Sequence, residues 1–275
     1  MVLGYAGVAY TRSATTEEVL LDRLLSPLEL DTREDAVADR MAFIVIITGT
    51  LLLYVFRYWG RPEYFLRSGM VDWVSSGLGG PLETHPGVGA YLYWGATSLA
   101  LRTLVPAGVI AWVIRESPRD WGFRLRGIRR HFRVYGVMYL VMFPVLFWAS
   151  GFASFRSYYP FYKQAADGGS AFWLYEIGYA FQFVGIEAFF RGFLTFGLTK
   201  RFGVLGIAIM TVPYTMIHFG KPAPEAFAAI IAGYVLGYLA LRSKSFVPGI
   251  FLHVGVAVTM DVLVLWRAGA LGRLL

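Results

Sequence analysis

The sequence predicts an all-α integral membrane protein, a bundle of about seven transmembrane helices. Hydrophobic residues make up 57% of its 275 residues and charged residues only 16%, whereas globular domains average about 45–50% apolar and about 25% charged. The apolar residues are also gathered into seven segments, each close to the roughly 20 residues that cross a bilayer as a helix. These segments are residues 41–58, 92–114, 134–152, 172–197, 203–219, 224–241 and 246–266.

Residues 1–40 precede the first apolar segment and differ from it in pattern. The apolar run at residues 2–10 is too short to span a bilayer. Thr15 is followed three residues later by Glu18, which is the spacing of a helix capping box, and an amphipathic stripe comes next. We therefore expect a cytoplasmic or interfacial amphipathic segment at 1–40 and a polytopic membrane domain at 41–275.

The loop between the second and third apolar segments sets the expected orientation. It contains seven arginines, namely Arg115, Arg119, Arg124, Arg126, Arg129, Arg130 and Arg133. The loop after the third segment holds only Arg156 and Lys163. Excess Lys and Arg mark cytoplasmic loops, so we expect residues 115–133 and the N-terminus to face the cytoplasm. The expected location is the bacterial inner (plasma) membrane.

The remaining composition limits the partners and the chemistry. The net charge of +7 comes from basic residues in short stretches between apolar segments, where they face anionic lipid, so we do not expect a nucleic-acid partner. The absence of cysteine excludes disulfides, thiolate catalysis and thiolate metal sites. The lipid bilayer is the expected surrounding.

Charged and histidine side chains interrupt three of the apolar segments. Glu187 and Arg191 lie four residues apart, on one face of a helix, where they can neutralise each other. His218 and His253 lie in two later segments. Glu187, His218 and His253 fall about 15, 22 and 10 Å from the inner ends of their helices. Because these depths overlap once helix tilt is allowed, we expect a shared polar site; a purely structural ion pair is the alternative.

Four short motifs follow one another in this part of the chain. They are Glu-x-x-x-Arg-Gly-Phe-Leu at 187–194, Tyr214-x-x-x-His218, Gly233-x-x-x-Gly237 with Leu-Arg-Ser at 241–243, and Pro248-Gly-Ile-Phe-Leu-His253. In this order and spacing they resemble the CAAX-processing and bacteriocin-processing (CPBP) family of intramembrane glutamic proteases, as a divergent member. The resemblance covers about residues 170–262, and Asp120-Trp-Gly-Phe resembles a feature upstream of that core.

The resemblance implies hydrolysis of a peptide bond within the membrane, without a metal or other cofactor. It assigns Glu187 and His218 to the activation of water and His253 to the stabilisation of the oxyanion. Arg191 and Tyr214 are supporting residues. The implied substrate is the tail of a membrane-anchored or lipidated protein.

The sequence departs from the family pattern at two positions. Family members usually carry Glu-Glu-x-x-x-Arg and His-x-x-x-Asn, but Ile186 takes the place of the first Glu and Ala257 that of the Asn. Tyr214 replaces a Phe, which is a mild change. Gln182 lies one turn before Ile186 and is able to hold a water molecule, although an amide cannot act as a base.

Three functions are compatible with this pattern. The first is an intramembrane endopeptidase, and the second is a catalytically impaired relative that binds a substrate or a partner membrane protein. The third is a membrane carrier that uses the same polar site, since such sites also line transport pathways. A zinc site from Glu187, His218 and His253 is chemically conceivable, but the sequence lacks His-Glu-x-x-His, and we expect no metal.

Overall fold

The computed structural model describes residues 33–72, 81–85 and 87–273. Every regular element in these ranges is a helix, which confirms the all-α fold class. The predicted amphipathic segment lies outside the described residues except for residues 33–40. The chain divides into two units after Arg40, and the architecture below is that of the unit that begins at Met41.

Five helical stretches of the described chain are long and apolar enough to cross a membrane. They are Ala36–Trp59, Gly87–Ile114, Ile128–Ala149, Ala223–Ser243 and Val247–Arg267. They correspond to the first, second, third, sixth and seventh predicted segments, although the second begins at Gly87 and not at residue 92. Only 17–39% of the most apolar part of each is buried, so each stretch leaves apolar surface uncovered by the protein, as helices surrounded by lipid do.

The two other predicted segments, 172–197 and 203–219, form helices that do not meet these criteria of length and hydropathy. Helix α12, Leu205–Met216, has 12 residues and is roughly 18 Å long, whereas the hydrocarbon core of a bilayer is about 30 Å thick. The fourth predicted segment lies inside a continuous helical run formed by α10 (Gly169–Ile186), η7 (Glu187–Leu194) and α11 (Thr195–Phe202). Its charged residues and glycines lower the hydropathy of this run. By length and hydropathy the described chain therefore has five candidate spans, not seven.

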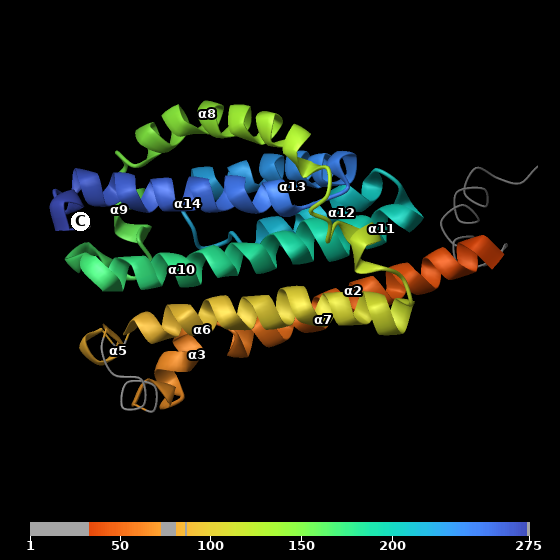
Figure 1. Ribbon diagram of the computed structural model, residues 1–275, viewed down its shortest axis with the longest axis horizontal. Helices are drawn as coiled ribbons and strands as arrows, with labels where there is room; N and C mark the ends of the chain where they lie inside the picture. Colours follow the sequence, from red (N-terminus) through yellow and green to blue (C-terminus); the bar gives the residue numbers. More distant parts are fainter. Residues whose placement is uncertain (1–32, 73–80, 86, 274–275) are drawn as a thin grey trace, which may run out of the picture. The chain divides into compact units, whose positions relative to one another are not determined.

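The run from α10 to α11 is the centre of the helix bundle (Figure 1). Helix α6 (Gly87–Leu99) packs along one side of α10, and α14 (Val247–Arg267) packs along the other side. All eight residues of η7, a π-helical segment, are buried. A helix that is apolar nearly all round needs neighbours on every side, and this explains why the central run is surrounded by other helices.

The outer helices complete the bundle. Helix α8 (Phe132–Ala149) packs on α14, and α12 packs on both α11 and α13 (Ala223–Ser243). Helix α2 (Arg33–Trp59) supplies the first candidate span. The second span continues from α6 through η2 (Ala100–Leu104), α7 (Val105–Gly108) and η3 (Val109–Ile114). The shorter elements are α3 (Pro62–Arg67), α5 (Pro81–Thr84), η4 (Pro118–Trp121), η5 (Ile128–Arg130), α9 (Ala153–Tyr158), η6 (Lys163–Asp167) and η8 (Leu271–Arg273).

Small residues allow α6 and α10 to approach closely. A Cβ atom on Gly178 would lie 2.5 Å from the carbonyl oxygen of Tyr91, and one on Gly185 would collide with Ser98. The contacts step forward by seven residues along both helices, so α6 and α10 run in the same direction, as Figure 1 also shows. Backbone-to-backbone approach of this kind is typical of helix pairs that associate in lipid.

The Gly233-x-x-x-Gly237 spacing has the same role between α12 and α13. Cβ atoms at these two positions would lie 2.8 Å from side-chain methyl carbons of Thr211 and Ile207, respectively. The two glycines therefore permit close approach of α12 and α13.

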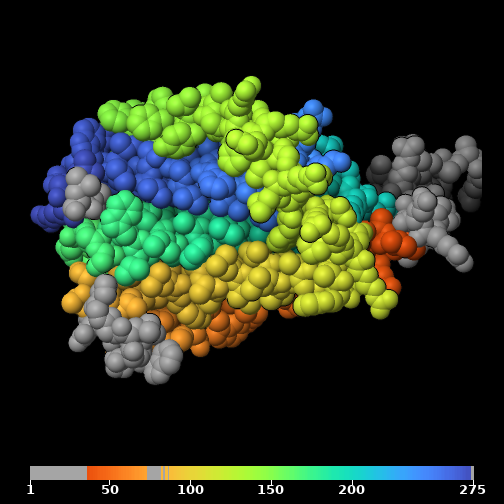
Figure 2. Space-filling view, in the orientation of Figure 1, coloured from red at the N-terminus to blue at the C-terminus, as the bar shows by residue number. Residues whose placement is uncertain are grey.

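The arginine-rich loop after η3 is fastened to the core through Trp121. This side chain is fully buried and stacks on Phe193 with ring centroids 5.9 Å apart. The hydroxyl of Ser245, just before α14, donates to the carbonyl oxygen of Arg124 at 2.6 Å. Figure 2 shows the yellow-green segment lying across one end of the bundle. The loop thus holds the end of η7 and the start of α14 together.

We expect Gly178→Leu to destabilise the fold by about 1–3 kcal/mol, because a side chain there overpacks the α6–α10 contact. Gly136→Leu is the matched control, since a Cβ at Gly136 in α8 meets nothing within 4 Å. The control should leave stability unchanged or raise it by up to about 1 kcal/mol, because Leu favours a helix more than Gly does. Thermal unfolding in detergent measures both variants, and equal losses in the two would contradict this packing.

Candidate active site

Glu187 is the first residue of η7, and its side chain is completely buried. Its Oε1 atom lies 2.9 Å from His253 Nδ1 and 3.4 Å from a terminal guanidinium nitrogen of Arg191. A carboxylate oxygen accepts hydrogen bonds, so Nδ1–H of His253 is the donor in this contact. The sequence-predicted residues Glu187, Arg191 and His253 therefore form one contiguous group from two helices.

Arg191 has three contacts that hold its charge inside the bundle. Beside Glu187, it donates to the carbonyl oxygen of Ala232 in α13 at 3.4 Å. Its guanidinium carbon lies 3.8 Å from the ring centroid of Tyr214 in α12, and a cation over an aromatic face is favourable. Tyr214 is itself fully buried. The replacement of Phe by Tyr at this position thus keeps the aromatic face that Arg191 covers.

His253 is presented by the second turn of α14. Its ring packs against Phe183 of α10 with centroids 4.3 Å apart, and 15% of its side chain is exposed. Because Nδ1–H is engaged by Glu187, the atom left for a substrate or water is Nε2.

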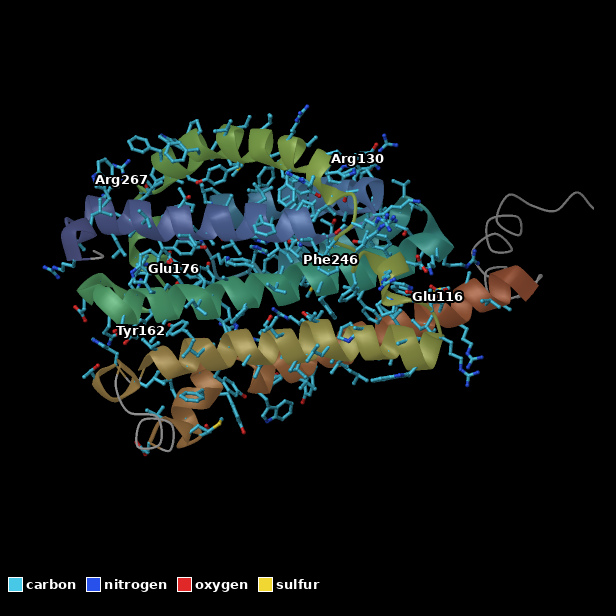
Figure 3. The ribbon with its side chains drawn as sticks, viewed as in Figure 1. Glu116, Arg130, Tyr162, Glu176, Phe246 and Arg267 are labelled. Atoms are coloured by element: carbon cyan, nitrogen blue, oxygen red, sulfur yellow. The ribbon has the colours of Figure 1, made fainter. Side chains whose placement is uncertain are left out.

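Gly249, one turn before His253, is needed for the approach of α14 to η7. A Cβ atom there would lie 2.6 Å from Glu187 Oε2. Phe246, at the start of α14 (Figure 3), would lie 3.0 Å from a Cβ on Gly192 of η7. Two glycines therefore allow the helices that carry Glu187 and His253 to touch.

His218 lies in the turn that follows α12 and not within a helix as predicted, because α12 ends at Met216. Its Nδ1 lies 2.8 Å from the carbonyl oxygen of Tyr214. A carbonyl only accepts, so Nδ1 carries the proton and Nε2 carries a lone pair. The buried ring is therefore prepared to accept a hydrogen bond from water or another donor.

The three predicted catalytic residues do not all contact one another. Glu187 and His253 are in direct contact, whereas His218 makes no hydrogen bond with either within the described residues. His218 is linked to them through the ring of Tyr214, 4.8 Å away, which in turn meets Arg191. His253 and Arg191 also act on it electrostatically. That all three line one cavity remains a prediction.

Gln182 and the two departures from the family pattern are also buried. Gln182 contacts α6, because its backbone carbonyl accepts from the hydroxyl of Ser98 at 3.0 Å. Its side-chain oxygen has no hydrogen-bond partner in the described part of the chain. Ile186 and Ala257 are 4% and 7% exposed and belong to the main hydrophobic core. Neither position supplies a polar group to the site.

No group of three or more His, Asp or Glu side chains is arranged to hold a metal ion in the described ranges 33–72, 81–85 and 87–273. Glu187 Oε1 is already occupied by His253 and Arg191. The arrangement suits proton transfer between a carboxylate and imidazole rings.

Sequence reasoning missed two further buried acids, Glu176 and Asp261. Glu176 is 6% exposed and Asp261 is fully buried, and they lie on the same two helices as Glu187 and His253. Their spacing was the available signal. Glu176 precedes Glu187 by 11 residues, which is about three helical turns, so both lie on one face of the helix.

The fold and the site thus define an all-α membrane protein with a buried Glu–Arg–His group. Residues 168–259 match the family model described as type II CAAX prenyl endopeptidase, Rce1-like. This range includes every residue of the group, and the match confirms the resemblance found in the sequence. No curated protein and no solved structure matches the chain.

We expect Arg191→Leu to destabilise the protein by about 3–5 kcal/mol, because it leaves the buried Glu187 carboxylate without its cation. The matched control is Lys221→Leu, which breaks another pair four residues apart, with Glu225, whose side chains are 17% and 23% exposed. The control should cost about 1 kcal/mol or less. The double variant Arg191→Leu with Glu187→Leu should recover much of the loss. Unfolding in detergent measures all three, and no recovery in the double variant would refute the ion pair as the cause.

Proposed function

We propose that this chain is an intramembrane endopeptidase, with Glu187, His218 and His253 as its catalytic residues. The observation that carries the proposal is the contact between His253 and Glu187 at 2.9 Å, in a carboxylate that is fully shielded from solvent. A carboxylate and an imidazole in hydrogen-bond contact are a recurrent arrangement for moving a proton. The family match supplies the reaction class, which is proteolysis.

The proposed chemistry uses atoms that the protein leaves available. Glu187 Oε2 has no hydrogen-bond donor within the described residues, so it is free to take a proton from water. His218 Nε2 accepts a hydrogen bond from the remaining O–H of the water, and the resulting hydroxide oxygen adds to the scissile carbonyl carbon. His253, when protonated, donates from Nε2 to the resulting oxyanion while Glu187 stabilises its charge. The proton held by Glu187 then passes to the leaving amine, and the peptide bond breaks.

The proposed substrate follows from the matched family. A CAAX sequence carries a prenylated cysteine followed by three residues at the C-terminus, and the matched description is that of a CAAX prenyl endopeptidase. We therefore propose a prenylated, membrane-anchored tail as the substrate class. The prenyl chain and the bilayer would bring the scissile bond to the depth of the buried site.

A second candidate function, the binding of a membrane-protein partner by a catalytically impaired relative, is favoured by the contacts of Glu187. Its Oε1 atom is shared between Arg191 and His253, which leaves only Oε2 for proton transfer. The carboxylate at 186 and the amide at 257 that family members usually carry are replaced by buried apolar side chains. An impaired relative that only binds a membrane-protein partner would not need Glu187 to act as a base.

Arg102 bears on whether a carboxylate at position 186 can be accommodated. It is 4% exposed and lies over Phe56, and its Nε and one terminal nitrogen have no hydrogen-bond partner in the described residues. Ser98 meets Gln182 and Gly185 across the α6–α10 contact. Because the helices run in the same direction, Arg102, one turn after Ser98, comes level with about position 186 or 189. A carboxylate at 186 would thus lie near a buried cation.

We expect Glu187→Gln, His218→Gln and His253→Gln each to lower cleavage of a prenylated CAAX reporter by about 100-fold or more, since each removes a proton-transfer group. His131→Gln, at the start of α8 and outside the site, is the matched control and should cleave like the wild type. Cleavage is measured by peptide release in detergent, with size-exclusion profiles to verify folding. Full activity of a well-folded Glu187→Gln variant would reject the proposed role of Glu187.

We expect the double variant Ile186→Glu with Ala257→Asn to cleave the same reporter at least about tenfold faster than wild type, because an oxyanion donor alone is worth roughly 100- to 1000-fold. Position 257 lies one turn after His253 on the same face of α14. Wild-type cleavage that depends on Glu187 but does not improve in the double variant would reject an impaired protease. No cleavage by either form would favour the binding role.

A further inference from the structure

A second polar layer lies between α10 and α14, away from the Glu187–His253 contact. It consists of Glu176 from α10 and Asp261 from α14, which interact electrostatically. The hydroxyl of Tyr175 donates to Asp261 Oδ2 at 2.8 Å and accepts from the backbone N–H of Phe161 at 3.2 Å. Figure 3 labels Glu176 between the ribbons of α10 and α14, near α9.

The oxygens of this pair lack donors. Within the described residues, no group donates to either carboxyl oxygen of Glu176 or to Asp261 Oδ1, and all three atoms are inaccessible to solvent. A buried acceptor without a donor costs about 1–3 kcal/mol, and more if it is charged. Two ionised carboxylates that act on each other in an apolar interior would in addition repel each other. The pair as a doubly charged group is therefore strongly disfavoured.

The neighbouring cations are engaged elsewhere. Lys163 in η6 donates to the carbonyl oxygen of Ser157 at 2.7 Å, and Lys221 pairs with Glu225 at 2.7 Å. The titratable and charged groups that face Asp261 or Glu176 from the packed elements are Tyr91 of α6, Tyr159 after α9, Lys163 of η6, Tyr175 and Tyr179 of α10, and Lys221 with Glu225 at the start of α13. Burial raises the pKa of Tyr159 well above its ordinary value, so it stays neutral.

We propose that Glu176 and Asp261 form a proton-binding pair, which holds at least one proton at neutral pH and thereby permits α10 and α14 to pack at this end of the bundle. The proton removes one of two like charges. It also turns an oxygen that lacks a donor into a hydrogen-bond donor itself. A shared proton between paired carboxyl groups is known chemistry.

The pair has a structural consequence for the site on the same two helices. Glu176 and Glu187 are about 16 Å apart along their helix, and His253 and Asp261 are about 12 Å apart along theirs. Loss of the proton would push α10 and α14 apart at one layer and so strain the Glu187–His253 contact at the other. This consequence for cleavage rests on the proposed function, whereas proton binding itself does not.

The test is the pH dependence of folding. Carboxyl groups of an unfolded chain ionise near pH 4, so above that pH the folded protein holds a proton that the unfolded chain has released. The sign is fixed: the folding equilibrium constant falls as pH rises, by up to about tenfold per pH unit, until the pair loses its proton. The variant Glu176→Gln with Asp261→Asn is neutral at every pH and should lack this component of the slope.

Glu63→Gln is the matched control, because it removes an exposed carboxylate in α3 that is paired with Arg61; it should keep the wild-type slope. Infrared spectroscopy supplies a second readout that needs no unfolding. The wild type at neutral pH should show the carbonyl band of a protonated carboxyl group, and the double amide variant should lose it. If that variant does not fold, titration of this band in the wild type decides alone. Equal slopes in wild type and variant, or no such band at neutral pH, would overturn the proposal.

Discussion

A carboxylate inside a membrane protein must be matched by a positive charge or by a proton, and Glu187 meets this requirement through Arg191 and His253. The surrounding structure makes the match possible. Tyr214 covers the guanidinium of Arg191, and Gly249 leaves room for the second carboxylate oxygen. The fully buried π-helical segment η7 is tolerated because its two charged residues neutralise each other.

Close helix approach depends on small residues at the points where function needs contact. Gly249 and Gly192 allow η7 and α14 to touch, and Gly178 and Gly185 do the same for α10 and α6. In lipid there is little hydrophobic force between helices, so such close packing supplies much of their association. The loop carrying Trp121 then fastens η7 to the start of α14, which fixes the distance between Glu187 and His253.

The sequence was sufficient to predict those features that depend on residues close together in the chain. The apolar segments gave the helical class, and the four-residue spacing gave the contact of Arg191 with Glu187. The estimated depths in the bilayer correctly predicted that His253 lies near Glu187. They could not predict that His218 makes no direct bond to either residue, because the position of His218 depends on where α12 ends. Glu176 and Asp261 were overlooked, since each lies in a segment that reads as apolar, and only the packing of α10 on α14 brings them together. The spacing of Glu176 from Glu187 places both on one helix face, but the approach of Glu176 to Asp261 has no signal in either segment alone.

Charge balance distinguishes three buried layers of this bundle. Glu187 and Arg191 cancel each other's charge within one turn of helix. The guanidinium of Arg102 has no ion-paired anion in the described residues. The carboxyl groups of Glu176 and Asp261 have no bonded cation among the same residues. A carboxylate at position 186, which family members usually carry, would lie near the first of these. With Ile186 at that position, the guanidinium of Arg102 in η2 has no carboxylate partner in the described residues.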